Sequence, residues 1–226
     1  AKSAVQDEAQ EKDARLMDYS GDNQSGLWIS NDQEFGRGHD AVIKRTDVIN
    51  RRISELVVDT INGHFPVSKE QFKTGLSKWR KRYPAHGSFE RLMKKRQWYF
   101  DGAHNQDATN ELVRHMNSIA PPEEWYVVLS FMKDKLTEEV SELWRSFPNI
   151  YLYAMSRERA ADAEWMKFIF KEGVVLQNRN MAIEKLRSLE TELVIFSGSF
   201  YFYSVVKNWM GTLDSADQFN LPAQSK

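Results

Sequence analysis

Apolar residues from position 84 onward follow two alternating patterns. Short continuous apolar runs of strand length are separated by stretches in which apolar residues recur every three or four positions, as on one face of a helix. The five predicted strands are Gln97–Phe100, Trp125–Ser130, Ile150–Ala154, Val174–Leu176 and Leu193–Phe196. The predicted helices that follow them, in the same order, are Leu112–Ile119, Leu136–Phe147, Ala160–Glu172, Met181–Leu189 and Phe200–Met210. This alternation predicts an α/β fold with a Rossmann-like, mostly parallel sheet and helices on both faces.

The first part of the chain lacks this alternation and is predicted to be helical with a broken middle. Ala4–Met17 is a polar, weakly amphipathic helix, and Ile49–Ile61 carries apolar residues at helical spacing. A capping box begins a third helix, because the Ser68 hydroxyl can accept from the third helical amide while the Gln71 side chain reaches back. Between the first two helices, Gly26–Ser30 could form one short strand.

The predicted domain organisation has three parts: a helical segment (1–83), a Rossmann-like domain (84–213) and a polar tail (214–226). In a chain of 226 residues, 41% hydrophobic and 28% charged residues are enough to bury a sizeable core. The longest apolar run is far shorter than the roughly 18 residues that span a bilayer, so we expect no membrane partner. The chain has no cysteine, which excludes disulfides and cysteine catalysis and makes a reducing cytoplasm the expected location.

Polar residues follow three of the predicted strands, at the edge where parallel α/β sheets bind ligands. After the first strand comes Asp101-Gly-Ala-His104-Asn105. Its carboxylate and imidazole could orient a cation, an amine or a ribose, and Asn105 could cap a helix whose first amides bind an anion. The same residues also suit a structural role, with a tight turn at Asp101 and a surface histidine at His104.

The other two strand ends offer groups that could bind anions. After the last strand, the Ser199 hydroxyl lies at a predicted helix start, where it could bind a carboxylate or phosphate or act only as an N-cap. After the second strand, the sequence MKDK at Met132–Lys135 brings two lysines that could bind anions or form a solvated loop.

A basic run with interleaved aromatic residues covers positions 78–96. Such a run could bind nucleic acid or an acidic small molecule, or remain a solvated face. The net charge of −1 argues against nucleic acid as a partner. The sequence has neither a phosphate loop nor a G-x-G-x-x-G fingerprint, and its five histidines are scattered, so we expect no metal site and no complete nucleotide site in this chain.

The motif DGAHN at Asp101–Asn105 resembles the C-terminal domain of folylpolyglutamate synthase/dihydrofolate synthase, a family of the Mur ligase superfamily. The helix with Asn50 resembles an Asn-Ala helix of this family, and residues 1–20 resemble the end of its ATPase domain. Other motifs occur in the family's order: Gly87–Glu90 resembles Gly-Arg-Phe-Glu, Met132–Lys135 its MKDK element, Arg157–Ala163 its Pro-Arg-Ala segment and Gly198–Tyr201 its Gly-Ser-Leu-Tyr.

The resemblance implies an ATP-dependent amide ligase. In this family ATP phosphorylates a substrate carboxylate, and the amine of L-glutamate attacks the acyl phosphate, so that a folate or dihydropteroate gains a glutamate. The resemblance implies that ATP and Mg²⁺ are bound mainly by an N-terminal ATPase domain with a phosphate loop. This chain is then either a fragment of a longer protein, which we favour, or a chain that needs another chain, and we expect it to be inactive alone. By the same resemblance, Asn50 and Asp101 would contact ATP, and His104, Ser199 and Tyr201 would line the glutamate site. None of these residues is assigned as a catalytic acid or base.

One motif departs from the family pattern, because Ser88 stands where the family has the arginine of Gly-Arg-Phe-Glu. A serine cannot supply the planar cationic fork of a guanidinium, so either Arg91 or His86 replaces it or the contact with the nucleotide is weakened. This departure keeps a second hypothesis open, a stand-alone binding module that has lost ATP chemistry. A nucleic-acid binder that uses the basic run at 78–96 is the third.

Overall fold

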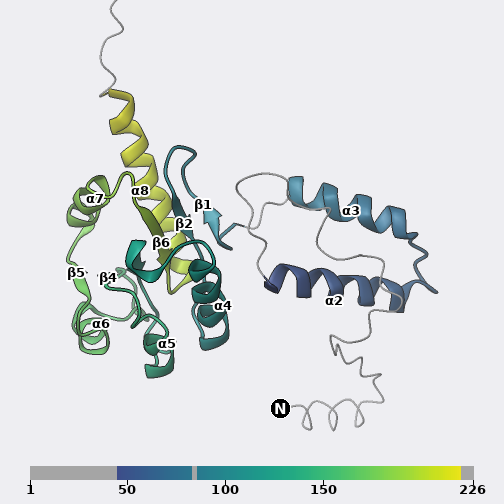
Figure 1. Ribbon diagram of the computed structural model, residues 1–226, viewed down its shortest axis with the longest axis horizontal. Helices are drawn as coiled ribbons and strands as arrows, with labels where there is room; N and C mark the ends of the chain where they lie inside the picture. Colours follow the sequence, from purple (N-terminus) through teal and green to yellow (C-terminus); the bar gives the residue numbers. More distant parts are fainter. Residues whose placement is uncertain (1–44, 83–85, 220–226) are drawn as a thin grey trace, which may run out of the picture. The chain divides into compact units, whose positions relative to one another are not determined.

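The computed structural model describes residues 45–82 and 86–219, and the chain divides into two compact units, Ala1–Lys78 and Trp79–Lys226 (Figure 1). Each unit is described by itself. The predicted helix Ala4–Met17 and the predicted strand Gly26–Ser30 lie outside the described residues.

The described part of the first unit is helical, with α2 (Arg45–Ile61) followed by the start of α3 (Lys69–Arg82). The predicted capping box is confirmed at the start of α3. The Gln71 amide donates to Ser68 Oγ over 3.2 Å, and the Ser68 amide donates to Gln71 Oε1 over 2.7 Å. Two otherwise unsatisfied amides are thereby paired, which fixes where α3 begins.

The second unit is built on one six-stranded sheet with the order β1-β2-β6-β3-β4-β5. The strands β2 to β6 are parallel, and β1 joins β2 in the antiparallel direction. All five predicted strands are confirmed to within one residue at each end. The bounds are β1 (Glu90–Arg91), β2 (Trp98–Phe100), β3 (Trp125–Leu129), β4 (Asn149–Tyr153), β5 (Val174–Leu176) and β6 (Leu193–Ser197).

Helices cover both faces of this sheet, as predicted. Residues of α7 and α8 pack with Trp98 and Phe196 in one buried cluster, whereas residues of α4, α5 and α6 pack with Trp125 and Ile195 in another. Neighbouring strand residues such as Ile195 and Phe196 point to opposite faces, so both faces of each central strand are apolar. The helices are α4 (Gln106–Asn117), α5 (Glu138–Glu142), α6 (Ala163–Ile169), α7 (Arg179–Arg187) and α8 (Phe200–Phe219), with a short 3₁₀ turn η1 (Pro122–Glu124) before β3.

The bounds of several helices differ from the prediction, and the differences are largest in α5 and α8. The α5 helix ends at Glu142, and the chain continues to Phe147 through turns in which the Trp144 amide donates to Ser141 O and the Phe147 amide to Trp144 O. Trp144 and Phe147 are three residues apart, and these turns bring both side chains to the buried side. The spacing of the apolar residues therefore fits the turns as well as it fits a helix. The α8 helix runs past Met210 to Phe219, into the predicted polar tail, because no proline stops it before Pro222. No helix in the described part of the chain is long and apolar enough to cross a membrane.

Candidate functional site

Three strand ends that carry the predicted chemistry lie side by side, because β6 pairs with β2 on one side and with β3 on the other. Backbone hydrogen bonds continue beyond the strands. The Gly198 amide donates to Ala103 O over 3.0 Å, and the Ser130 amide donates to Ser197 O over 3.0 Å. The segments after β2, β3 and β6 therefore form one connected edge, where ligands of parallel α/β sheets bind.

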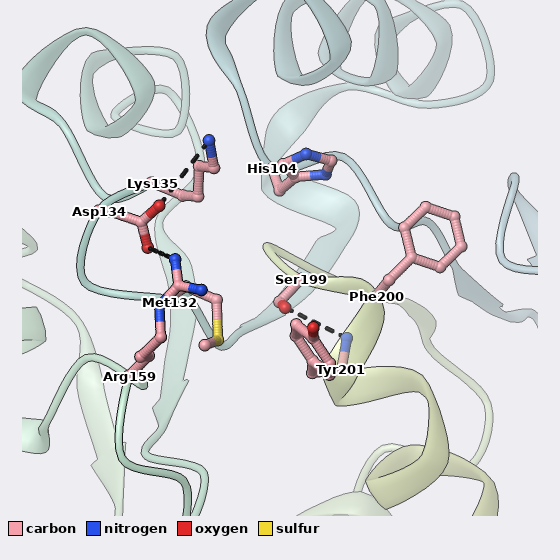
Figure 2. A pocket seen from close by; sticks show the side chains of 8 residues that line it. All are labelled: His104, Met132, Asp134, Lys135, Arg159, Ser199, Phe200 and Tyr201. Atoms are coloured by element: carbon pink, nitrogen blue, oxygen red, sulfur yellow. Dashed lines mark hydrogen bonds and ion pairs between the residues drawn. The ribbon is translucent and has the colours of Figure 1, made fainter.

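A cavity of about 140 Å³ opens at this edge (Figure 2). Of the residues predicted for a glutamate site, His104, Ser199 and Tyr201 all line it, although they come from two separate junctions. The other lining residues are Met132, Asp134 and Lys135 from the MKDK segment, with Arg159 and Phe200. The structure thus brings the three predicted residues together, while their role in binding glutamate stays a prediction.

The His104 ring is held in one orientation by its own loop. Its Nδ1 lies 2.9 Å from Gly102 O. A carbonyl oxygen can only accept, so Nδ1 carries the hydrogen and Nε2 is left as the nitrogen that can meet a ligand. The next residue, Asn105, is the N-cap of α4, since its Oδ1 accepts from the Ala108 amide over 2.9 Å.

Ser199 is 3% exposed and serves as a local cap at the start of α8. Its Oγ accepts from the Tyr201 amide over 3.2 Å. This is the structural role that the sequence left open, and it leaves the hydroxyl hydrogen available to donate to an anion. The Gly198 backbone has φ 104°, and a Cβ there would lie 2.5 Å from Ser130 O, so only glycine allows β6 and β3 to approach this closely.

The opposite side of the cavity is charged. Asp134 accepts from Arg159 Nη2 over 3.2 Å through Oδ1, and Lys135 Nζ lies 3.8 Å from its other oxygen. Lys133 is directed elsewhere and pairs with Asp162 over 3.8 Å. The MKDK segment is therefore only partly the solvated loop considered from the sequence, because three of its four residues line the cavity.

Asp101 does not line the cavity. It is 7% exposed; its Oδ1 accepts from the Ala103 amide over 3.0 Å, and its Oδ2 accepts from the Phe89 amide over 2.8 Å. These bonds hold the backbone of two loops, which fits the structural role that the sequence left open. Asn50 is exposed on α2 in the first unit. Contact of either residue with ATP stays a prediction.

Several residues that were suggested for contact with the nucleotide already form other hydrogen bonds in the described part of the chain. Within residues 45–82 and 86–219 no group of three or more His, Asp or Glu side chains could hold a metal ion. The carboxylate assigned to ATP, Asp101, is turned toward backbone amides. Two residues suggested as replacements for the family's arginine are also engaged, since Arg91 Nε donates to Arg96 O and His86 Nδ1 lies 3.4 Å from Glu90 Oε2.

The turn at Gly87–Glu90 is fixed by a polar cluster. Glu90 accepts from the Gly87 amide over 2.9 Å and from the Tyr203 hydroxyl over 2.8 Å. Burial raises the pKa of Glu90, but these two hydrogen bonds, with the nearby cations, outweigh burial and hold that pKa below its usual value. Burial, together with the hydrogen bond to Glu90 and its charge, raises the pKa of Tyr203 to about 12.

The basic run at 78–96 does not form a continuous exposed surface in its described part. Arg96 is 4% exposed, and its guanidinium lies 4.6 Å from the centre of the Trp98 ring and pairs with Glu190 over 3.2 Å. A buried and paired arginine cannot contact a phosphate backbone, which weakens the hypothesis of a nucleic-acid binder.

Comparison with known proteins gives a family match within the second unit. The family model of the Mur ligase glutamate ligase domain matches residues 89–200. No curated protein sequence matches the chain. Among solved structures, the fold is similar to Mycobacterium tuberculosis folylpolyglutamate synthase complexed with ADP and AMPPCP, with a TM-score of 0.58 and 16% identity over 71% of this chain and 39% of that one.

Two other structures give similar values. Folylpolyglutamate synthase from Thermotoga maritima has a TM-score of 0.52 and 21% identity, over 74% of this chain and 39% of that one. A bifunctional folylpolyglutamate synthase/dihydrofolate synthase with Mn, AMPPNP and L-glutamate bound has a TM-score of 0.51 and 18% identity, over 66% of this chain and 36% of that one. This chain thus spans about two fifths of the length of the first two proteins. Residues 89–200 of this chain are thus similar to the glutamate ligase domain of Mur ligases.

Proposed function

We propose that this chain supplies the glutamate-binding C-terminal domain of an ATP-dependent amide ligase that adds glutamate to folate, of the folylpolyglutamate/dihydrofolate synthase type. The family match supports the class of domain. The observation that carries the proposal is the convergence of His104, Ser199 and Tyr201 on one cavity. The proposal includes a second, phosphate-loop domain as a partner, because the family resemblance assigns most of the contacts with ATP and Mg²⁺ to such a domain.

The size of the cavity supports an amino acid as its ligand. Pockets for drug-sized ligands measure roughly 300–1,000 Å³. The cavity here has about 140 Å³, which is too small for a nucleotide or a pteridine with its tail and is in the range of one amino acid. The Ser199 hydroxyl and the start of the long helix α8 favour a carboxylate, whereas His104 Nε2 is an acceptor and suits the ammonium group of the amino acid.

The chemistry proposed for these residues is positioning. In the reaction, the glutamate nitrogen forms a bond to the carbonyl carbon of a phosphorylated carboxylate, phosphate leaves, and the nitrogen loses a proton to solvent or phosphate. ATP, held by the partner domain, supplies the activation. Residues that hold the amino acid's carboxylate fix the direction of its amine, and such orientation alone lowers the barrier by several kcal/mol. We assign His104 to holding the amino acid rather than to removing the proton.

The glutamate site is tested by binding. Titration of the ¹⁵N-labelled chain with L-glutamate should shift the amide signals of the loops at 102–105 and 198–201. Ser199→Ala and His104→Ala should each weaken binding by about tenfold or more, since each removes one hydrogen bond to a charged ligand. Ser204→Ala, on the exposed side of the same helix, and His64→Ala, in the first unit, are matched controls that should leave the affinity unchanged.

The ligase role is tested by turnover. The isolated chain with ATP, Mg²⁺, L-glutamate and a reduced folate should give no ADP and no longer folate tail, and addition of a phosphate-loop domain should give both. Robust turnover by the chain alone would refute the requirement for a partner.

A second candidate function, a stand-alone module that binds glutamate without ATP chemistry, is favoured by Ser88 in place of arginine. Glutamate binding that stays the same with and without nucleotide, even beside a supplied phosphate-loop domain, would favour this second function.

A further inference from the structure

The short helix α6 carries large apolar side chains on two opposite sides. On its inner side Met166 and the C-cap residue Phe170 are buried in the core of the second unit. On its outer side Trp165 is 42% exposed and Phe168 is 69% exposed. A helix at a protein surface normally carries polar residues on the side away from the core. The packing of this domain therefore does not explain Trp165 and Phe168, which we call the aromatic pair.

The two rings of the aromatic pair form one continuous apolar surface. Their centroids lie 5.7 Å apart, and the ring planes are inclined by 19°. The α6 helix packs on β4 and β5, the last two strands at one end of the sheet, and neither ring lines the cavity (Figure 1). Single exposed apolar residues are common, whereas two large rings in contact are typical of an interaction surface.

The charges beside the aromatic pair differ in sign along the helix. Glu164 and Lys171 are both exposed, four residues before Phe168 and three residues after it. In the part of the chain that the structure describes, neither side chain forms an ion pair. Lys167 adds a second cation to the later half, so that this half stays positive in spite of Glu172. The aromatic pair thus lies between an acidic and a basic group that both lack a partner within this domain.

A second copy of this chain offers the complementary pattern. When two α6 helices pack antiparallel, with a two-fold axis near Phe168, Glu164 of each copy faces Lys171 of the other. The reason is that the two residues lie at nearly equal distances on either side of Phe168. In such a symmetric interface every contact occurs twice. A parallel arrangement would instead place like charges opposite each other.

The exposed area of the aromatic pair indicates a weak dimer. An aromatic side chain can bury roughly 150–250 Å², so the exposed fractions leave about 200–250 Å² per copy and about 400–500 Å² in a dimer. That is most of the apolar part of a weak interface, which buries somewhat less than about 1,200 Å² in total, and far less than a permanent dimer needs. We propose that the aromatic pair on α6 is a self-association surface, through which two copies of this chain form a reversible antiparallel dimer.

The test of the aromatic pair is the association state of the 226-residue chain. Sedimentation equilibrium from about 10 μM to about 1 mM, the range of weak interfaces, should show a reversible monomer–dimer equilibrium. Trp165→Ser/Phe168→Ser should weaken association by at least about tenfold, because central aromatic residues supply most of the binding energy. Phe65→Ser is the matched control. Phe65 in the first unit is 67% exposed, and its loss should leave the dimer unchanged.

Charge reversal tests the antiparallel arrangement. Glu164→Lys or Lys171→Glu alone should each weaken association by about threefold or more, because like charges then face each other twice in the dimer. Both changes in one chain should restore the original affinity to within about twofold, since the reversed pairs are again of opposite sign. Glu184→Lys makes the same change at an exposed position of α7, on the other face of the sheet, and should have no effect.

The outcomes that contradict the proposal are distinct. A chain that stays monomeric over the whole range would overturn it, also where the same two rings prove necessary for binding a supplied phosphate-loop domain. A dimer that survives loss of both rings, or that Phe65→Ser weakens equally, would place the interface elsewhere. Single charge reversals without effect, or a double reversal that fails to restore association, would overturn the antiparallel arrangement. Thermal unfolding of each variant checks that it is folded.

Discussion

The two junctions that carry His104 and Ser199 are held in place by opposite means. After β2, the buried carboxylate of Asp101 accepts hydrogen bonds from two backbone amides. After β6, the absence of a side chain at Gly198 allows the chain to pass against Ser130 O. The first junction therefore depends on hydrogen bonds to a charge and the second on free volume. Changes of polarity should disturb the first, and added atoms should disturb the second.

The largest effect is expected for Gly198→Ala. The new Cβ would lie 2.5 Å from a backbone oxygen at φ 104°, and strain together with overpacking should cost about 4 kcal/mol of unfolding free energy. Denaturation in urea measures this loss. Gly211→Ala in α8 is the control: a Cβ there meets nothing within 4 Å, so the change should stabilise the helix by about 0.5–1 kcal/mol. Equal stability of the two variants would contradict the volume argument.

Asp101→Ala is expected to cost less, about 2 kcal/mol, because it leaves the amides of Phe89 and Ala103 without their charged acceptor. Asp101→Asn keeps the shape and one acceptor oxygen, so its loss should be about half as large. Urea denaturation of both variants separates shape from charge at this junction. A larger loss for asparagine than for alanine would show that the hydrogen bonds are not what holds the loop.

The next largest loss of unfolding free energy is expected for removal of a helix cap. Asn105→Ala should cost about 1 kcal/mol, since the Ala108 amide loses its side-chain acceptor. Asn178→Ala removes the equivalent cap of α7, where Oδ1 accepts from the Met181 amide, and should cost a similar amount. Only the change at Asn105, next to His104, should also weaken glutamate binding in the NMR titration. The same loss of binding in both variants would point to general destabilisation.

The smallest expected effect is a change in pH dependence for Tyr203→Phe. The folded-state pKa of Glu90 lies below the ordinary value of 4.5, so its contribution is present above that pH and is lost as the pH falls through the folded value. Without the Tyr203 hydroxyl the lowering of this pKa shrinks. Unfolding free energy should then fall less steeply below about pH 4.5, with a loss of under about 1 kcal/mol at neutral pH. If the unfolding free energy of the variant falls with the same steepness below about pH 4.5, the cations and the Gly87 amide are enough to lower the pKa of Glu90.

The strands of the sheet were predicted well because the apolar run that identifies a buried strand lies within a few consecutive residues. The run Trp125–Leu129 is apolar at nearly every position, as burial on both faces requires, and the structure forms β3 there. The capping boundary at Ser68 and Gln71 was predictable for the same reason, since both partners lie within one turn. By contrast, the two-residue strand β1 carries no periodic signal and was not predicted.

The site was predicted only in part, because most of its contacts join distant residues. The role of Asp101 depends on the Phe89 amide, twelve residues away, which no motif at Asp101 reveals. Arg159 reaches the cavity through pairing between the segments after β3 and β4. Phe200 is 56% exposed, and its ring lies where a Cβ on Gly87 or Gly102 would be, a packing that depends on three separate segments. The spacing of the sequence could predict which loops lie together but not which of their atoms are in contact.

The position of β6 also has a consequence for how this domain is made. The strand is the last of the sheet in sequence, yet it lies between β2 and β3. A chain still emerging from the ribosome therefore holds two open strand edges that have no native partner until residue 197 has been synthesised, and such edges pair readily with other chains. Completion of the sheet and formation of the cavity at its edge are a single late event, so any shortening that removes β6 abolishes both at once.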